Sequence, residues 1–297
     1  MGRDVRLLVV GEALVEFMRP QRDLPLDRPG PVVGPFPSGA PAIFASVAAR
    51  LGVPTALCAV VGDDPFGRLL LDRLARDGVD TGAVRVDPEH TTATAFVAYT
   101  SGGERTFVFH VRHAAAAQLR PSDLGDLPER AEWLHVSGST LALGEGMAET
   151  AVEAARRVKA SGGRLGVDPN VRPEAVSAEM LVRVRDLVEA ADAVFPSEGE
   201  LEALGLDEDA LVARDAVVCT TRGAAGASVR APGVSAEVPA PPAREVDPTG
   251  AGDTLAAGFT AATLLGADPE AAALVGCRLA ARSVEVLGPM EAPVERL

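Results

Sequence analysis

The stretch from Trp133 to Thr220 alternates short apolar runs with longer amphipathic segments, and this alternation limits the fold more than any other feature of the sequence. It predicts strands at 133–137, 164–168, 193–196 and 216–220, with helices at 146–160, 179–190 and 198–204 between them. A helix between each pair of successive strands is typical of a parallel sheet covered by helices on both faces. The sequence therefore predicts a doubly wound, mostly parallel α/β fold.

The segments on either side extend the same layout. Residues 5–17 are expected to be a buried first strand that ends in a Gly turn, followed by an alternating extension. A further strand is expected at 55–61, with helices at 41–51 and 65–77 and two alanine-rich helices within 253–286. Residues 18–37 are rich in Pro, Asp and Gly and are expected to be loop or edge structure. No internal repeat interrupts the pattern, so residues 1–297 are expected to form a single domain.

A different texture marks residues 91–111. Two runs rich in β-branched and aromatic residues flank Ser101-Gly102-Gly103, which predicts a β-hairpin. Together with residues 14–37, the hairpin is expected to form a small sheet that stands apart from the main body. Its expected bounds are about 14–37 and 91–113.

Charge excludes several classes of partner. The formal net charge is −14, whereas a nucleic-acid or anionic-membrane surface requires a basic face. Lys159 is the only lysine, so the chain has no P-loop, whose signature ends in Gly-Lys-Ser/Thr. A nucleotide site in this chain must therefore be of another kind.

The cysteines and the N-terminus suggest a location. Cys58, Cys219 and Cys277 lie far apart in apolar surroundings and form no CxxC pair, as expected of buried thiols in a reducing compartment. The apolar run at 7–10 is too short for a signal peptide or a membrane span. The expected location is the cytoplasm.

Polar residues gather where the predicted strands end, which is where open α/β sheets bind ligands. Three such segments follow successive strands: Asp168-Pro-Asn-Val-Arg172, Ser197-Glu-Gly-Glu200 and Thr221-Arg222-Gly223-Ala-Ala-Gly226.

The most informative segment is Gly250-Ala251-Gly252-Asp253, directly before a predicted helix. Two glycines around a small residue let consecutive N–H groups point at one spot, and the positive helix end adds to an anion cradle. Asp253 has two interpretations at this stage. It either caps the helix or removes a proton from an alcohol beside the cradle.

The residues 247–259, DPTGAGDTLAAGF, resemble the second signature of the ribokinase (PfkB) carbohydrate kinase family, and Ser38-Gly39-Ala40-Pro41-Ala42 resembles the first. Further segments are similar and occur in family order: VGDDPFG (61–67), GERTFVF (103–109), LHVSGSTLAL (134–143), DPNVRP (168–173), SEGE (197–200) and TRGAAGA (221–227). The closest pattern is that of kinases for 2-keto-3-deoxygluconate or fructose. The resemblance spans roughly residues 5–290.

The resemblance implies the reaction and the site. It implies a ribokinase-like fold with a lid over the sugar, ATP and Mg²⁺ as cofactors, K⁺ as a further ion, and pairing into homodimers through the lid. Asp253 would be the catalytic base, and Gly250, Ala251 and Gly252 would form the anion hole. The implied cofactor contacts are Ser197, Glu200, Thr221, Arg222, Gly223, Gly226, Gly250 and Gly252; the substrate contacts are Glu16, Gly39, Ala40, Ile43, Phe96, Phe109, Arg112 and Arg172; and the ion contacts are Glu200 (Mg²⁺, through water) and Asp247 with Thr249 (a monovalent cation).

The chain departs from the family pattern at the sugar. Ser38 replaces the first glycine of the first signature, and Ile43 replaces an asparagine that hydrogen-bonds sugar hydroxyls, a contact that isoleucine cannot make. Glu16 replaces the more common aspartate, and Ser197 replaces the usual asparagine of its motif.

Arg112 follows the hairpin at a shifted position. It either binds the carboxylate of a sugar acid as a bidentate partner or is a solvated lid residue. His110 and His113 have no third ligand nearby, so a metal pair is not favoured.

The sequence thus predicts an ATP-dependent kinase that phosphorylates a ketose or keto-sugar acid. A nucleoside kinase of the same family stays an alternative because Phe96, Phe107 and Phe109 are available to stack on a base, and a catalytically idle sugar-binding relative is a second. A nicotinamide-binding dehydrogenase is not favoured, since no Gly-x-Gly-x-x-Gly follows the first strand.

Overall fold

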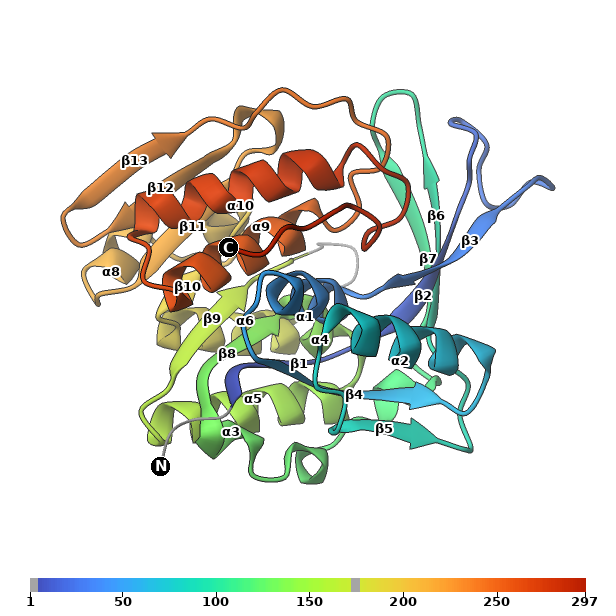
Figure 1. Cartoon of the computed structure of the whole chain (residues 1–297), viewed down its shortest axis with the longest axis horizontal. Helices are drawn as coiled ribbons and strands as arrows, with labels where there is room; N and C mark the ends of the chain where they lie inside the picture. Colours follow the sequence, from blue (N-terminus) through green and yellow to red (C-terminus); the bar gives the residue numbers. More distant parts are fainter. Residues whose placement is uncertain (1–4, 172–176) are drawn as a thin grey trace.

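A computed structural model describes residues 5–171 and 177–297, which fold around one large sheet with a small sheet beside it (Figure 1). The large sheet has nine strands in the order β13-β12-β11-β10-β9-β8-β1-β4-β5. Their bounds are β1 Val5–Val10, β4 Thr55–Gly62, β5 Val84–Asp87, β8 Ala131–Ser137, β9 Arg164–Asp168, β10 Ala193–Val194, β11 Val217–Thr221, β12 Ala227–Ala231 and β13 Val234–Val238. Neighbouring strands from β5 to β11 are parallel, whereas β12 and β13 pair antiparallel. The predicted mostly parallel sheet is confirmed.

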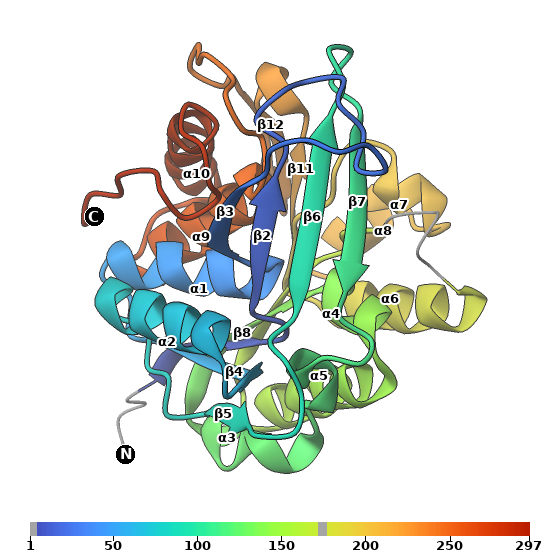
Figure 2. The same ribbon diagram turned by 90° about the vertical axis from the view of Figure 1, so that its right-hand side faces the viewer.

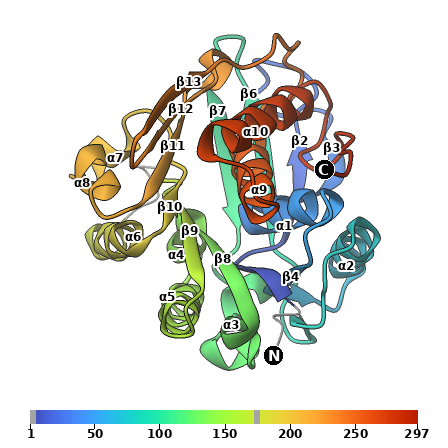
Figure 3. The ribbon, with the colours of Figure 1, turned by 60° about the vertical axis from the view of Figure 1, so that its left-hand side comes forward.

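Helices cover both faces of this sheet (Figure 3). The helices are α1 Ala40–Arg50, α2 Pro65–Asp77, α3 Leu127–Arg130, α4 Gly138–Leu143, α5 Glu145–Ala160, α6 Ala178–Ala190, α7 Glu200–Ala203, α8 Glu208–Val212, α9 Ala251–Leu264 and α10 Pro269–Ser283. Helices α1, α2, α9 and α10 lie on one side, and α5 and α6 on the other. Along β1, Leu7 and Val9 join the core under α1 and α9, while Leu8 and Val10 join the core under α5 and α6. Burial on both faces explains why this strand is a continuous apolar run.

The small sheet has four strands in the order β3-β2-β6-β7 and stands upright beside the body (Figure 2). Its strands are β2 Leu14–Met18, β3 Val33–Ser38, β6 Thr94–Tyr99 and β7 Arg105–His110. The predicted hairpin is β6–β7, with Tyr99 opposite Arg105 and Thr94 opposite His110. We call these four strands the lid sheet.

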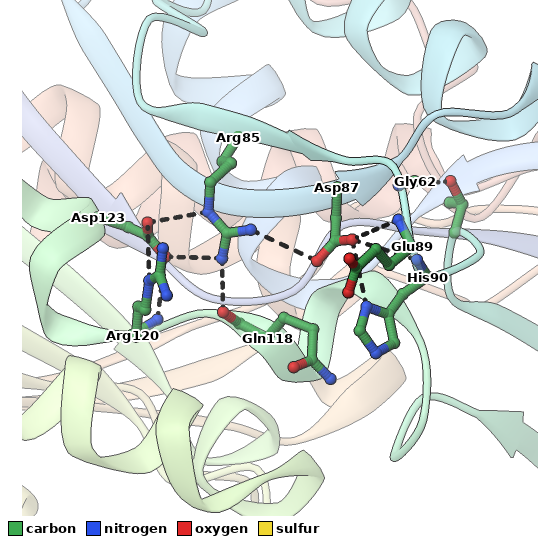
Figure 4. Close-up of polar contacts among 9 residues, drawn as sticks. Gly62, Arg85, Asp87, Glu89, His90, Gln118, Arg120 and Asp123 are labelled. Carbon is green, nitrogen blue, oxygen red and sulfur yellow. Dashed lines mark hydrogen bonds and ion pairs between the residues drawn. The ribbon is translucent and has the colours of Figure 1, made fainter.

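Charged side chains anchor the chain where it leaves the large sheet for β6 (Figure 4). Arg85 of β5 makes two bonds to Asp123, at 3.0 and 3.1 Å, and donates to the Gln118 carbonyl at 2.6 Å. Asp87 at the end of β5 accepts the backbone N–H groups of Glu89 and His90 at 2.8 and 3.2 Å. These contacts fix the segments on both sides of the β6–β7 hairpin to the body, because Gln118 lies in the chain that follows β7.

Two further expectations concern the thiols and the membrane. The three cysteines are free and buried, as predicted, and burial raises the pKa of the Cys58 thiol to about 12. Among the described helices, none combines the length and apolarity that a membrane span requires.

Candidate active site

A cavity of about 130 Å³ lies between the lid sheet and the carboxyl ends of the central strands; we call it the inner cavity. Its walls come from the loop after β1, the lid sheet, the start of α1, α4 and the start of α9. The lining residues are Glu12, Leu14, Glu16, Ser38, Gly39, Ala40, Ile43, Arg105, Phe107, Phe109, Ser139, Ala142, Leu143, Asn170, Met180, Thr249, Gly250 and Asp253. Five of the predicted substrate contacts therefore share one cavity: Glu16, Gly39, Ala40, Ile43 and Phe109.

A wider cavity of about 540 Å³, the outer cavity, opens along the ends of β9, β10 and β11. The predicted cofactor contacts lie together along its wall. The lining residues are Arg105, Asp168, Asn170, Ser197, Glu198, Glu200, Thr221, Arg222, Gly223, Gly226, Pro248, Gly250, Ala251, Gly252, Asp253, Leu255 and Ala280.

The two cavities meet at four residues that line both of them: Arg105, Asn170, Gly250 and Asp253. A group that passes from a molecule in one cavity to a molecule in the other must cross this junction. The junction holds a carboxylate, a guanidinium and the positive end of α9, which suits the transfer of an anionic group.

The backbone at the start of α9 explains how the junction is built. Gly250 is the N-cap of the helix, with φ at 77°, a conformation that residues with a side chain rarely adopt. A Cβ at this position would also lie 3.0 Å from Cδ1 of Ile43. The N-cap residue Gly250 has no side chain to cap α9, and Asp253 lies in the first turn of the helix. Asp253 is therefore not the N-cap residue of α9.

The N–H groups of this turn are available to different degrees. The Ala251 N–H makes a long bond of 3.4 Å to the Pro248 carbonyl. A Cβ at Gly252 would meet nothing within 4 Å, so a ligand can approach its backbone closely. The first N–H groups of a helix have no partner four residues back, so they suit an anion.

Acidic and hydroxyl side chains face the inner cavity from the other side. The buried Glu16 accepts a 3.0 Å bond from Ser38 Oγ, and the buried Glu12 accepts bonds of 2.7 and 2.8 Å from Ser139 and Thr140. The hydroxyl partners hold both carboxylates in place. Gly39 lets the chain turn into α1: its φ is 104°, and a Cβ would lie 2.8 Å from the Glu12 carbonyl.

In the outer cavity, Glu200 joins two segments. Its two oxygens accept the N–H groups of Val171 and Ser197, at 2.8 and 2.7 Å. Among the described residues, no cluster of three His, Cys, Asp or Glu side chains is arranged to hold a metal.

A buried cluster ties the lid sheet to the loop before α9. The Tyr99 hydroxyl lies 2.8 Å from Asp247 Oδ1 and 2.5 Å from Thr249 Oγ1, and Asp247 also accepts the N–H groups of Thr249 and Gly288, each at 3.0 Å. Burial and the Asp247 carboxylate raise the pKa of Tyr99 well above its ordinary range. These contacts assign Asp247 to holding the loop. A monovalent cation beside Asp247 and Thr249 stays a prediction.

Of the predicted substrate contacts that the structure describes, two are not brought to the inner cavity. Phe96 stacks on Phe17 with ring centroids 5.2 Å apart and lies on the opposite face of the lid sheet, because alternate residues of β6 point to opposite faces. Arg112 is exposed and lines neighbouring cavities with His113 instead. Arg172 lies outside the described residues.

Several cavity residues were not predicted: Glu12, Arg105 and Ser139. Phe107 was considered only for stacking on a base, and Asn170 only as part of the segment that follows β9. The signal for Glu12 was its place directly after the first strand, at the edge where such sheets bind ligands. Arg105, Phe107 and Phe109 are every second residue of β7, so their side chains share one face of the strand. The prediction for Phe109 therefore could have been extended to the other two.

Residues 5–296 match the family described as pfkB family carbohydrate kinase. A fructokinase of Klebsiella pneumoniae is 34% identical over 266 residues, which cover 86% of this chain and 83% of that protein. The E. coli protein named ribokinase II, solved with ATP and Mg²⁺, has a TM-score of 0.92 at 35% identity, covering 98% of this chain and 96% of the other. A fructokinase of Vibrio cholerae, solved with fructose, ADP and calcium, has a TM-score of 0.84 at 31% identity, covering 99% and 97%.

Proposed function

The chain belongs to the pfkB family of carbohydrate kinases, and we propose that it transfers the γ-phosphoryl group of ATP to a hydroxyl of a fructose-like ketose. One observation carries the proposal: Asp253 and Gly250 line both the inner and the outer cavity. A sugar in the inner cavity and a nucleotide in the outer one would meet at a carboxylate and a helix N-terminus. These are the two groups that an alcohol needs to attack a phosphoryl group.

The roles of the residues follow from this placement. The Asp253 carboxylate accepts the proton of the attacking hydroxyl. The N–H groups of Gly250, Gly252 and, less freely, Ala251 stabilise the charge on the transferring group. ATP supplies the phosphoryl group, and Mg²⁺ neutralises its oxygens.

The outer cavity suits a nucleotide. Thr221 and Gly223 end β11 and begin the following turn, and a Cβ at Gly223 would meet nothing within 4 Å. We assign Ser197, Thr221, Arg222, Gly223 and Gly226 to the nucleotide. We assign Glu200, whose two oxygens accept backbone N–H groups, to Mg²⁺ through water.

Charge in the inner cavity favours a neutral ketose over a keto-sugar acid. Its described lining has three carboxylates, Glu12, Glu16 and Asp253, and one cation, Arg105. A substrate carboxylate would be repelled there, and Arg112, the residue considered for it, lines neighbouring cavities. The acids and their hydroxyl partners instead offer acceptors to sugar hydroxyls, although Ile43 offers none. The fructokinases among the relatives agree with this choice.

The test is substrate-dependent ADP release with Mg-ATP across neutral ketoses, keto-sugar acids and nucleosides. We expect the highest kcat/KM with a ketose, and a loss of about 10²–10⁴ in kcat for Asp253→Asn, with the KM for ATP little changed. Asp268→Asn, an acidic cap at the start of α10 outside both cavities, is the matched control for turnover. A preference for a nucleoside would favour the alternative of a nucleoside kinase. In that enzyme the rings of Phe107 and Phe109, whose centroids lie 5.3 Å apart, would face a base. Equal turnover by Asp253→Asn would contradict the assigned base.

We propose in addition that two copies pair through the outer face of the lid sheet and that the protein works in the cytoplasm. Val108 on this face is 41% exposed, and β7 is an edge strand of the sheet. Three free, buried thiols suit a reducing compartment.

A further inference from the structure

Arg105 of the lid sheet is the one residue at the cavity junction to which the proposed reaction gives no role. The others are accounted for: Asp253 as the base, Gly250 in the anion hole, and Asn170 through its bonds. Asn170 donates from its side chain to Ser137 Oγ at 3.2 Å and from its backbone to Asp168 at 3.0 Å. Arg105 comes from β7 and lines both cavities.

The two cavities are lined by more negative than positive groups, and Arg105 can supply positive charge to a ligand there. The described lining carries the carboxylates of Glu12, Glu16, Asp168, Glu198, Glu200 and Asp253. Its cations are Arg105 and Arg222, and Arg222 is paired with Glu237 of β13. Arg105 has no ion pair or hydrogen bond from its side chain to any residue that the structure describes, and it is exposed. A triphosphate that enters here brings further negative charge, which needs a free cation.

The register of the hairpin fixes where Arg105 can reach. Arg105 lies opposite Tyr99, and the Tyr99 hydroxyl bonds to Asp247 and Thr249 in the loop before α9. The cross-strand neighbour of Arg105 is therefore docked onto the loop that leads into Gly250. A guanidinium presents several N–H donors in one plane, which matches the oxygens of a phosphoryl group.

We propose that Arg105 is a catalytic residue whose guanidinium contacts the transferring phosphoryl group; this inference rests on the proposed function. During transfer, the acceptor O–H bond breaks and its proton goes to Asp253. A bond forms between the acceptor oxygen and the γ-phosphorus. The bond from that phosphorus to the bridging oxygen breaks, and its electron pair leaves with ADP. Arg105 stabilises the charge on the equatorial oxygens, the role that an arginine finger plays in other phosphoryl transfers.

The experiment compares Arg105→Met, Arg105→Lys and the matched control Arg28→Met in the loop between β2 and β3, which lines neither cavity. We expect Arg105→Met to lower kcat by about 10²–10³, with the KM values for sugar and ATP within a few-fold of wild type. Arg105→Lys should recover part of the loss, because it restores the charge without the fork. Arg28→Met should behave as wild type.

A binding measurement separates catalysis from folding. ADP with aluminium fluoride and the sugar imitates the transferring group, and calorimetry should show that Arg105→Met weakens its binding by about the same factor as kcat while ATP binding is kept. A raised sugar KM with unchanged kcat would overturn the inference and make Arg105 a substrate contact. Wild-type kinetics for Arg105→Met, in an enzyme that Asp253→Asn inactivates, would overturn this inference alone. An inactive wild type would overturn the proposed function and the inference with it.

Discussion

His135 of β8 is a histidine that cannot take up a proton without cost. It is 1% exposed, and its ring stacks on Phe44 of α1 with centroids 3.6 Å apart. Its Nδ1 has no hydrogen-bond partner among the described residues. Burial lowers the pKa of His135 from 6.5 to about 3.

This lowered pKa predicts a loss of stability in acid. Between pH 6.5 and 3 the unfolded state binds a proton at His135 and the folded state does not. The free energy of unfolding should therefore fall as pH drops below 6.5, by about 1.4 kcal/mol per pH unit from this group. Urea unfolding at several pH values should show a shallower acid loss for His135→Phe, which keeps a flat ring against Phe44. The exposed His113→Gln should follow wild type; parallel curves for His135→Phe and wild type would contradict the prediction.

Single residues of the site were predictable where a local motif reports on backbone geometry. Gly250 and Asp253, which line both cavities, could be singled out because a glycine pair before a helix predicts an anion cradle by itself. Glu12 was missed, because its role depends on hydroxyls of Ser139 and Thr140, more than a hundred residues away in sequence. Phe96 was placed wrongly, because composition shows an aromatic residue in a strand but not which face of the sheet it takes.

At the scale of elements, strand β6 is held at both ends. Near its start, Asp64 of the α2 cap accepts the N–H and hydroxyl of Thr92 at 2.7 and 2.8 Å. At its end, Tyr99 bonds to Asp247 and Thr249. The lid sheet is thus coupled to the loop that leads into the proposed anion hole.

We expect Tyr99→Phe to uncouple the lid sheet from the loop before α9. The hydrogen bond to a buried carboxylate is worth about 1.5–3 kcal/mol, so kcat/KM for the sugar should fall about 10- to 100-fold. Thr106→Val, which removes an exposed hydroxyl from β7, is the matched control.

Tyr99 is the only tyrosine, so tyrosinate absorbance reports on it alone. Because its pKa is raised, the absorbance should stay absent near pH 10 in the folded protein and appear on unfolding. If Tyr99 in the folded protein titrated near pH 10, that result would contradict the docking of Tyr99 onto the loop before α9.

Helices and strands with a strong periodic pattern were predicted within one or two residues, as for α2, predicted and found at Pro65–Asp77. The misses have local causes. Helix α7 begins at Glu200 and not at 198, because Gly199 has φ at 85° and forms the N-cap. The β12–β13 hairpin was overlooked, because its strands lie at an edge of the sheet and bury at most alternate residues, so neither is a continuous apolar run.

At the scale of the whole molecule, the layered body was predictable and the assembly was not. Alternating strands and helices leave few ways to cover a sheet, so the body followed from pattern alone. Assembly depends on the shape of a surface, and the sequence pattern describes no surface. The lid sheet bears on both the fold of the body and the assembly, since one of its faces closes the inner cavity and the other faces outward.

The proposed pairing through the outer face of the lid sheet makes a testable prediction. Val108 on β7 is 41% exposed, and burying it against a second copy would favour association, while a stable interface needs about 1,200–2,000 Å² in all. We expect Val108→Asp to shift sedimentation equilibrium toward monomer, with a dimer dissociation constant raised at least about tenfold, because a charge would be buried without a partner. Val182→Asp on α6, where the valine is 57% exposed, is the matched control and should leave the equilibrium unchanged. Since the paired face backs the strands that carry Arg105 and Tyr99, the monomeric variant should also show a higher sugar KM. A wild type that sediments as a monomer at all concentrations, or a Val108→Asp dimer as tight as wild type, would rule out pairing through this face.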